Sequence, residues 1–453
     1  MRRESNSSWA WAATGCVVLA AAGAASGTTY YVVTNGVEAN DGLTWATAVK
    51  SISNAVARTV DNDTVMVSNG TYGLTEQIAI TNAITVMSTN GAAATTVRRT
   101  ASGDDAPQHR IFYMNHSLAV VSGFTIWGGH IQYTEGGNVW IQDGTLRNCV
   151  VTSNGVGGSR FYSTVYVATG LVRNCTITRC NGQYVGPVSV NNGAVQNCAI
   201  TDNNNSEQEG GVRVTGPSGV LRNCLVARNT GGGNNLAGGV VISQGKMENC
   251  TIVGNYRPGG TGGVYVDGSS GGTIKNCILY GNRALSGVSD YQAANSPIIT
   301  FSYLTPSYAG AGNLAVSDPQ FMDYAGKDYR LRPGSPCLHT GTNLAWMTGA
   351  TDLDGNPRIS PTGGTPDMGC YEYPVGALDG NLIASPLSGL EPVSVVLTAY
   401  TQGTNTSGLY YKWGFTNSSV VDVQGSDRQV ATNLYAGGIW SVTLTVTNGA
   451  GEA

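Results

Sequence analysis

Residues 221–229 read LRNCLVARN, and close copies of this nine-residue frame recur through the middle of the chain. The other copies are LRNCVVTSN at 146–154, VRNCTITRC at 172–180, VQNCAITDN at 195–203, MENCTIVGN at 247–255 and IKNCILYGN at 274–282. The Asn-Cys dipeptides of successive copies lie 26, 23, 26, 26 and 27 residues apart. This regular spacing is typical of a repeat protein with units of about 25 residues.

The frame alternates apolar and polar residues and shows no helical period, so each unit is expected to contain short β-strands. The unit is too short for a propeller blade of about 40–45 residues, and it lacks the repeated Leu frame of leucine-rich repeats. Strands joined by turns into one coil, stacked on the next coil at about 4.8 Å, fit a unit of this length. The sequence therefore predicts an all-β fold, a right-handed single-stranded parallel β-helix over residues 27–310.

Stacked coils would place equivalent residues above one another, so we expect a structural ladder of Asn side chains. Asn suits such a position because it tolerates the left-handed conformation that tight turns require. The expected ladder comprises Asn148, Asn174, Asn197, Asn223, Asn249 and Asn276. A second Asn position follows five residues after each Cys, although one unit has Cys180 there. The repeated Cys residues are expected to form a reduced stack in the core, as small apolar side chains.

The N-terminus has the features of an exported protein. Arg2 and Arg3 precede an apolar run at residues 9–25, which ends in the small residues of 22–27. This pattern predicts a signal peptide at residues 1–26, because the run is shorter than the roughly 20 residues of a membrane span. We expect a secreted protein, extracellular or on a bacterial cell surface, with no transmembrane segment after signal removal.

A short helix is expected near the start of the mature chain. Apolar residues at positions 45, 48, 49, 52, 55 and 56 have helical spacing, and Thr44 could serve as the N-cap. Such a helix would cover the open end of the β-helix core, as terminal units of solenoids must.

The composition excludes one class of partner. Charged residues make up 11 % of the chain, against about 25 % in a typical soluble domain. The net charge is −4, and the 24 Lys and Arg residues are widely spread. These values argue against nucleic-acid binding, which needs a dense basic surface. We expect a monomer whose partner is a polysaccharide or another cell-surface ligand.

The opening of the mature chain, residues 30–48, resembles that of secreted pectin-lyase-like β-helix proteins. The Cys-x-Ile-x-x-Asn pattern, together with Gly-Gly-Val at 210–212, 238–240 and 262–264, is similar to passenger repeats of polymorphic outer-membrane proteins. Both resemblances imply a β-helix outside the cytoplasm.

Two further resemblances divide the remainder of the chain. DPQF at 318–321, GSPC at 334–337, DLDGNPR at 352–358 and DMGCYE at 367–372 resemble the closing segment of choice-of-anchor Q β-helix proteins. We therefore expect residues 311–375 to close the β-helix. Residues 376–453, with YKWGF at 411–415 and WSVTLTVT at 440–447, resemble a PKD domain, an immunoglobulin-like β-sandwich. This stretch has Gly-Phe-Thr after its Trp where that family has Asp-Phe-Gly-Asp, and we expect the sandwich to be incomplete at residue 453.

The candidate sites are few. Cys337 and Cys370 flank one compact part of the closing segment, and we expect a disulfide between them. Asp352 and Asp354 resemble the start of a calcium loop, but the other ligands of an EF-hand are missing, and a plain polar turn is the preferred explanation. No other cofactor is expected. A basic column, which precedes the Asn ladder and could contact an anionic glycan, comprises Arg147, Arg173, Arg222 and Lys275.

No catalytic cluster is evident, because the acidic residues occupy unlike positions in the repeat. We therefore expect a non-catalytic protein that acts in adhesion or display, or as a glycan-binding rod. The alternative is an extracellular polysaccharide lyase or glycoside hydrolase acting on acidic polysaccharides, since enzymes share this architecture. A groove that combines Lys or Arg with several carboxylates on one sheet would favour the alternative.

Overall fold

The computed structural model describes most of the chain. Between residues 27 and 373 it leaves out only 101–106, 153–162, 183–184, 234–236, 268–270, 295, 315–317 and 360–363. Further on, it describes 379–385, 393–402, 409–415, 423–426, 429–435 and 442–447. The expected signal peptide, residues 1–26, lies outside the described residues.

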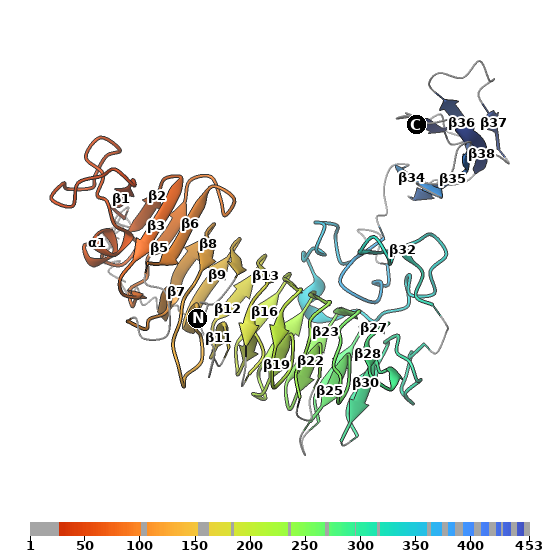
Figure 1. The fold of residues 1–453 in the computed structure, drawn as a ribbon, viewed down its shortest axis with the longest axis horizontal. Helices are drawn as coiled ribbons and strands as arrows, with labels where there is room; N and C mark the ends of the chain where they lie inside the picture. The colour runs from red at the N-terminus through yellow and green to blue at the C-terminus, as the bar shows by residue number, and fades with distance from the viewer. Residues whose placement is uncertain are drawn as a thin grey trace, which may run out of the picture.

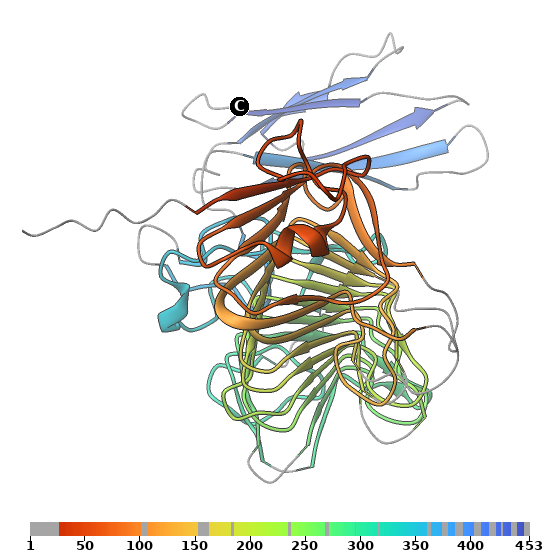
Figure 2. The same cartoon turned by 90° about the vertical axis from the view of Figure 1, so that its left-hand side faces the viewer.

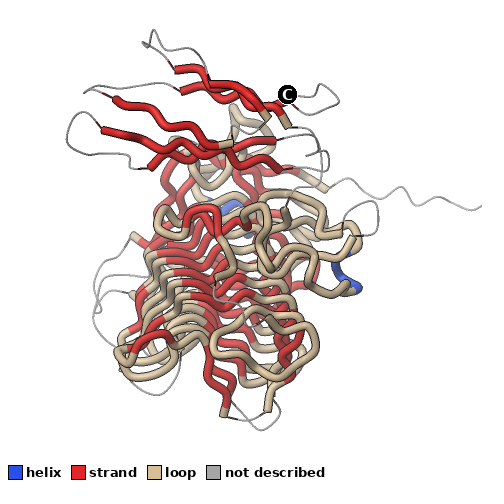
Figure 3. The backbone as a smooth tube through the Cα atoms, turned by 90° about the vertical axis from the view of Figure 1, so that its right-hand side faces the viewer, coloured by secondary structure: helices blue, strands red, loops and turns tan. Residues whose placement is uncertain are grey.

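The main body is a parallel β-helix whose coils stack along one axis (Figure 1). Each full coil contributes strands to three faces, and every strand pairs in parallel with its equivalents in the neighbouring coils. Faces 1 and 2 belong to one 18-stranded sheet, and face 3 is a separate 9-stranded sheet. Figure 3 shows the strands of successive coils lying in layers, with turns and loops between them.

The strands of each face are as follows. Face 1 comprises β4 (Ile78–Ile80), the first part of β7 (Phe112–Ser122) and of β9 (Val139–Arg147), β11 (Val165–Val167), β15 (Val188–Val190), β19 (Val212–Val214), β22 (Val240–Ile242), β25 (Val264–Val266) and β30 (Tyr291–Ala293). Face 2 comprises β1 (Thr29–Val32), β2 (Thr64–Val67), β5 (Thr85–Ser88), the second part of β7 and of β9, β12 (Leu171–Arg173), β16 (Ala194–Gln196), β20 (Val220–Arg222), β23 (Lys246–Glu248), β26 (Thr273–Lys275) and β31 (Ile298–Thr300). Face 3 comprises β3 (Gly70–Leu74), β6 (Thr95–Arg99), β8 (Thr125–Trp127), β10 (Val150–Thr152), β13 (Thr176–Thr178), β17 (Ala199–Thr201), β21 (Leu225–Ala227), β24 (Thr251–Val253) and β27 (Ile278–Tyr280). Two short pairs, β14 (Asn181–Gly182) with β18 (Asn204–Asn205) and β28 (Arg283–Ala284) with β29 (Gly287–Val288), lie in the loops.

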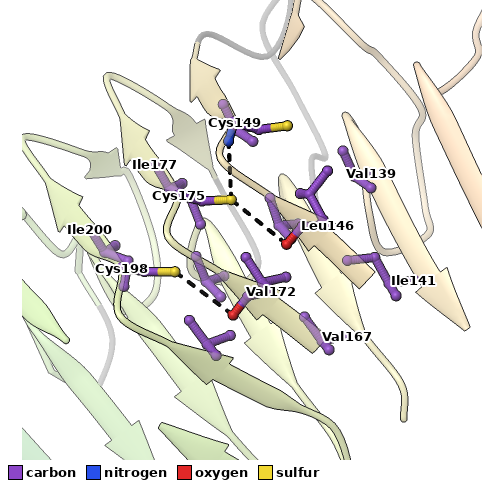
Figure 4. Close-up of a cluster of buried hydrophobic side chains, with 14 of the residues drawn as sticks. Val139, Ile141, Leu146, Cys149, Val167, Val172, Cys175, Ile177, Cys198 and Ile200 are labelled. Atoms are coloured by element: carbon purple, nitrogen blue, oxygen red, sulfur yellow. Dashed lines mark hydrogen bonds between the residues drawn. The ribbon is translucent and has the colours of Figure 1, made fainter. Parts of the chain in front are cut away.

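The core runs along the inside of the coils. In one coil, β11 buries its two end residues, Val165 and Val167, whereas β12 and β13 bury their middle residues, Val172 and Ile177. Cys175 lies buried at the turn between β12 and β13. Figure 4 shows Val167, Val172, Cys175 and Ile177 with copies from neighbouring coils, facing a common interior. The alternation follows from the period of two in a β-strand, which sends neighbouring side chains to opposite sides.

The cysteines of the frame form the expected reduced stack. Cys149, Cys175, Cys198, Cys224, Cys250 and Cys277 are all buried free thiols. Each thiol donates to the carbonyl oxygen two residues before it, for example from Cys175 Sγ to Arg173 O at 3.2 Å.

A short helix covers the N-terminal end of the core, as Figure 2 shows. This helix, α1, spans only Ile52–Ala57, and its Ile52 and Ala55 side chains are buried in the main core cluster. The prediction that Thr44 caps the helix is wrong. Ser51 is the N-cap, and its Oγ accepts a hydrogen bond from Asn54 N at 3.2 Å. The helix begins later because Val49 bridges to Val32 of β1, which takes the preceding residues out of a helical path.

The expected Asn ladder is only partly connected by its side chains. All six residues, from Asn148 to Asn276, have positive φ angles of 48–55°, as the turn between faces 2 and 3 requires. We call them the outer ladder. Side-chain amides bond directly from Asn174 to Asn148 at 3.4 Å, from Asn223 to Asn197 at 2.8 Å and from Asn276 to Asn249 at 3.1 Å.

A continuous ladder lies instead at the second Asn position, at the end of face 3. We call Asn203, Asn229, Asn255 and Asn282 the inner ladder; all four are at least 98 % buried. Each Nδ2 donates to the Oδ1 of the next member at 2.9–3.0 Å and to a carbonyl oxygen of the preceding coil at 2.9–3.0 Å. The last member, Asn282, donates to Asp290 Oδ1 from both its backbone N and its Nδ2. Every amide in this row is therefore satisfied without water.

The closing segment lies along the side of the last coils. It contains a hairpin of β32 (Phe321–Asp323) and β33 (Asp328–Leu331), followed by the 3-10 helix η1 (Ala345–Met347). Phe321, Tyr329 and Leu331 pack in one cluster with the outward side chains of face 3, which are Leu225, Ala227, Val253 and Ile278. Figure 1 shows β32 beside β27.

Backbone groups of the closing segment bind the outer ladder. Asn223 Nδ2 donates to Thr351 O at 2.9 Å, and Asn276 Nδ2 donates to Thr342 O at 2.8 Å while its Oδ1 accepts from Thr342 N at 2.8 Å. Within the segment, the fully buried Arg358 pairs with Glu372 at 2.9 Å. Burial raises the pKa of Glu372 to about 9, although the charge of Arg358 opposes this. The segment thus covers the outer ladder of several coils.

The described strands after residue 378 form two three-stranded antiparallel sheets. One has the order β34 (Asp379–Ser385), β35 (Val393–Gln402), β38 (Val430–Tyr435); the other has β37 (Val423–Gly425), β36 (Tyr410–Phe415), β39 (Val442–Thr447). Leu397, Ala399 and Ala431 from the first sheet share a core cluster with Tyr411, Trp413 and Val446 from the second. Membership of the PKD family stays a prediction.

The inner ladder predicts a large effect of one substitution. Asn229→Leu would remove the acceptor of Asn203 N and of one Nδ2 hydrogen of Asn203, and would remove the donor to Ile200 O. We expect it to lower the free energy of unfolding of the β-helix by on the order of 4 kcal/mol in denaturant titrations. The control is Asn148→Gly, at an exposed turn residue whose positive φ angle Gly adopts freely. It should lower the free energy of unfolding by less than about 1 kcal/mol. Equal losses in the two variants would contradict the assigned role of the inner ladder.

The end of the inner ladder predicts a pH dependence. Burial raises the pKa of Asp290 from 3.8 to about 6, while its hydrogen bonds from Asn282 oppose this. Because the folded pKa is the higher one, the stability that Asp290 contributes is complete below about pH 4 and is lost as the pH rises through 6. We expect a loss of about 3 kcal/mol across this window, and Asp290→Asn should remove it. Thermal unfolding from pH 4 to 7 measures the slope, with Asp267→Asn as the control; an unchanged slope in Asp290→Asn would contradict the assignment.

Candidate functional site

The basic column lies on one line, as its place in the repeat predicts. Strand pairing puts Arg147 opposite Arg173, Arg222 opposite Glu248 and Glu248 opposite Lys275, all at the last position of face-2 strands. Gln196 fills the position between Arg173 and Arg222. The alignment is therefore real, and a glycan contact along it stays a prediction.

The closing segment interrupts this column in its middle. Arg222 forms an ion pair with Glu248 at 3.1 Å, and its guanidinium lies over the ring of Trp346 from η1, 4.9 Å from the centroid. Arg222 is thus occupied by contacts within the protein. Arg173 is exposed, whereas Arg147 and Lys275 are half-buried. The basic column offers a smaller surface to an anionic ligand than its sequence implies.

Asp352 and Asp354 lie in the loop of the closing segment that borders a cavity of about 510 Å³. Asp352 is buried and accepts hydrogen bonds from the backbone of Asp354, Asn356 and Glu372 at 2.7–2.9 Å. Asp354 forms an ion pair with Arg330 at 2.5 Å. Their oxygens are engaged in organising the loop, and the described residues contain no group of three His, Cys, Asp or Glu side chains that could hold a metal ion.

The expected disulfide is not formed in the structure. Cys337 and Cys370 are both buried in the closing-segment cluster, but each is a free thiol. Their backbones have separate partners: Cys337 N donates to Ser335 Oγ, and Cys370 N donates to Thr251 Oγ1 of the β-helix. Burial raises the pKa of the Cys337 thiol to about 12 and raises that of Cys370 further, so both stay protonated.

Face 1 carries a row of aromatic residues that the repeat analysis did not reveal. Tyr113, Trp140 and Tyr166 are the outward middle residues of β7, β9 and β11, and strand pairing sets them directly opposite one another. Their ring centroids are 6.4 Å and 4.9 Å apart, and all three are half-buried. We call these three residues the aromatic strip. The next two positions along the row are Ser189 and Arg213.

Two arginines border the aromatic strip, Arg110 beside it and Arg213 further along the same row. The Arg110 guanidinium lies over the Trp140 ring, 4.7 Å from its centroid, and donates to Glu135 O at 3.1 Å. Arg213 makes a two-point ion pair with Glu209, with Nε to Oε1 at 2.7 Å and Nη2 to Oε2 at 2.6 Å. Both guanidinium groups are therefore held in fixed orientations at the edge of face 1.

Two carboxylates also come together at this edge. Glu135 accepts from the backbone N of Ser163 at 3.1 Å and from the Ser163 hydroxyl, and Glu209 accepts from Gly186 N at 2.7 Å. Ser163 and Gly186 both lie two residues before paired valines of adjacent coils, so the two backbone donors are about one coil spacing, roughly 5 Å, apart. Burial raises the pKa of Glu135, and the charge of Glu209 adds to this.

This arrangement has the chemistry of a carbohydrate site. Aromatic faces pack against the apolar C–H surface of sugar rings, and fixed polar groups around them orient hydroxyl or carboxylate groups. The residues of the aromatic strip are 27 and 26 residues apart, so extending the repeat spacing upstream could have found them. Glu135 and Glu209 lie in loops of differing length, and no spacing in the sequence relates them.

Among the comparisons with known proteins, a family model supports the fold. Residues 109–262 match the family model described as the right handed beta helix region. No curated protein matches the chain. Among solved structures, the chain is similar to one titled rhamnogalacturonan lyase, with 14 % identity and a TM-score of 0.41 over 68 % of this chain and 94 % of that one. Among the described residues, no helix has both the length and the apolar character needed to cross a membrane.

The match to this family model covers the central coils, and the strand pairing extends the same architecture on both sides of them. The main body of this chain is a right-handed parallel β-helix.

Proposed function

We propose that this chain is a secreted or cell-surface glycan-binding protein, and that face 1 of its β-helix holds a polysaccharide lying along the axis of the coils. The aromatic strip of Tyr113, Trp140 and Tyr166 carries this proposal, because it presents one ring from each of three consecutive coils. A polymer with a regular repeat matches a surface with a regular repeat, so each ring could stack on a different sugar unit.

The surroundings of the aromatic strip support an anionic glycan. Arg110 is stacked on Trp140, and Arg213 continues the same row two coils beyond Tyr166. Secretion rests on the basic and apolar residues at the N-terminus, and the closing and PKD-like segments fit a protein displayed on a bacterial surface. In this proposal the protein acts as a monomer in adhesion or display and needs no cofactor.

One observation favours a second candidate, a polysaccharide lyase or glycoside hydrolase that acts on acidic polysaccharides. Glu135 and Glu209 bind backbone donors of adjacent coils near Arg213, and a pair of carboxyl groups is what glycoside hydrolysis requires. Glu135, whose pKa is raised by burial, would be the proton donor to the leaving oxygen. Glu209 is fully buried and bound to Arg213, so it would position its neighbours.

The glycan-binding proposal predicts the effect of Trp140→Ala. Because Trp140 contacts both tyrosines and Arg110, its removal should weaken binding to an anionic polysaccharide at least tenfold. Affinity electrophoresis of the purified chain in gels that contain polygalacturonate, alginate or a neutral glucan measures this. The matched control is Trp127→Ala, which removes an exposed tryptophan from face 3.

Equal affinities of wild type, Trp140→Ala and Trp127→Ala would overturn the proposed site. Circular dichroism and thermal unfolding should show that both variants stay folded. The same polysaccharides, assayed for unsaturated uronate and for new reducing ends, distinguish the two candidates. Turnover that is lost in Glu135→Gln would establish the enzyme, whereas binding without turnover supports the non-catalytic protein.

A further inference from the structure

Arg257 is a fully buried residue whose charge is not balanced by a direct contact. It follows β24 in the loop that leads to β25, and its backbone N donates to Arg283 O at 2.9 Å. The side chain has no solvent exposure. Within the described part of the chain, none of its three side-chain nitrogens has a hydrogen-bond partner.

Such a residue is costly for the protein. A guanidinium carries five N–H donors, and burying them unpaired loses their hydration without replacing it. Burial accordingly lowers the pKa of Arg257, while the negative charge of Glu209 opposes this. Buried polar groups in native proteins nearly always have partners, so an unpartnered one calls for a ligand that supplies the missing acceptors.

Glu209 attracts Arg257 electrostatically, but no hydrogen bond joins the two residues. Its Oε1 already accepts from Gly186 N at 2.7 Å and from Arg213 Nε at 2.7 Å. Its Oε2 accepts from Arg213 Nη2 at 2.6 Å. The two-point ion pair also neutralises the charge of Glu209, which would otherwise repel an anion from this region.

The neighbouring coils have small residues at the equivalent position. Thr230, Tyr256 and Arg283 are in register through parallel bridges, so the residues that follow them, Gly231, Arg257 and Ala284, lie one above another. With Gly on one side and Ala on the other, the long Arg257 side chain has no large side-chain neighbour along this line. The side chains of the two neighbouring coils therefore supply no hydrogen-bond acceptor to Arg257.

We propose that Arg257 is the centre of a binding site for an oxyanion, a carboxylate or a sulfate group, under the loops beside face 1. Two N–H groups of the guanidinium would bind two oxygens of the anion in the fork geometry that Arg favours. The oxyanion could be free in solution or could be carried by an acidic or sulfated glycan. The site goes beyond the proposed function and stands without it, because no residue of the aromatic strip takes part.

The test uses thermal unfolding of the full chain in sodium sulfate against sodium chloride at equal ionic strength. Sulfate should raise the wild-type melting temperature by a few degrees beyond chloride, with a saturable dose dependence. Arg257→Met should abolish the sulfate effect and should melt higher than wild type in chloride, because it removes the unpaired buried charge. The matched control, Arg283→Gln, changes the exposed arginine of the next coil and should retain the sulfate effect.

Two results would overturn the site. One is a wild-type melting temperature that responds to sulfate no more than the Arg257→Met variant does, and the other is an Arg257→Met variant that melts lower than wild type in chloride. The same thermal unfolding experiment with trigalacturonate in place of sulfate distinguishes the two sources of the anion. A larger shift with trigalacturonate than with sulfate, retained in Trp140→Ala and lost in Arg257→Met, supports a glycan carboxylate. A shift with sulfate alone supports a free anion.

Discussion

The inner Asn ladder fixes the register on which the other features of this β-helix depend. Asn203, Asn229, Asn255 and Asn282 each use both hydrogens of the amide, one toward the preceding coil and one toward the next member. A coil that slipped by one residue would bury these amides without partners and would turn every side chain of the coil to the opposite side. The ladder therefore ties the stacking of coils to hydrogen bonding, in addition to the apolar contacts of the core. Asp290 ends it with a carboxyl group that accepts from Asn282.

This fixed register is also what creates the surface rows. Once coils stack in register, residues at one position of the repeat line up along the axis, which is how face 1 comes to present Tyr113, Trp140 and Tyr166 in a row. The loops between face 3 and face 1 differ in length from coil to coil, and they bring Glu135 and Glu209 to the edge of the same row, where Glu209 pairs with Arg213 of β19. The regular strands thus provide the aromatic row and Arg213, and the irregular loops provide the two carboxylates.

The sequence was sufficient to predict the architecture, because the Asn-Cys frame shows both the strand period and the coil length. It did not distinguish the two Asn positions, since their difference is one of environment. Asn229 is fully buried between coils, whereas Asn174 is exposed in a turn. The helix start was wrong because pairing of Val49 with Val32 overrides the local period. The expected disulfide was wrong because proximity in one cluster does not require that Cys337 and Cys370 be bonded. The candidate site on face 1 was missed because its aromatic residues lie upstream of the clearest repeats, and its carboxylates lie in loops without a common spacing.

Hydrogen–deuterium exchange of the full chain, with and without a saturating anionic polysaccharide, tests the central claim most directly. If a polymer lies along face 1, added protection should recur in the peptides that contain Tyr113, Trp140 and Tyr166, one in each of three successive coils. The intervening segments of faces 2 and 3 should exchange as they do in the free protein. Protection confined to the basic column of face 2, or to a single coil, would contradict the account.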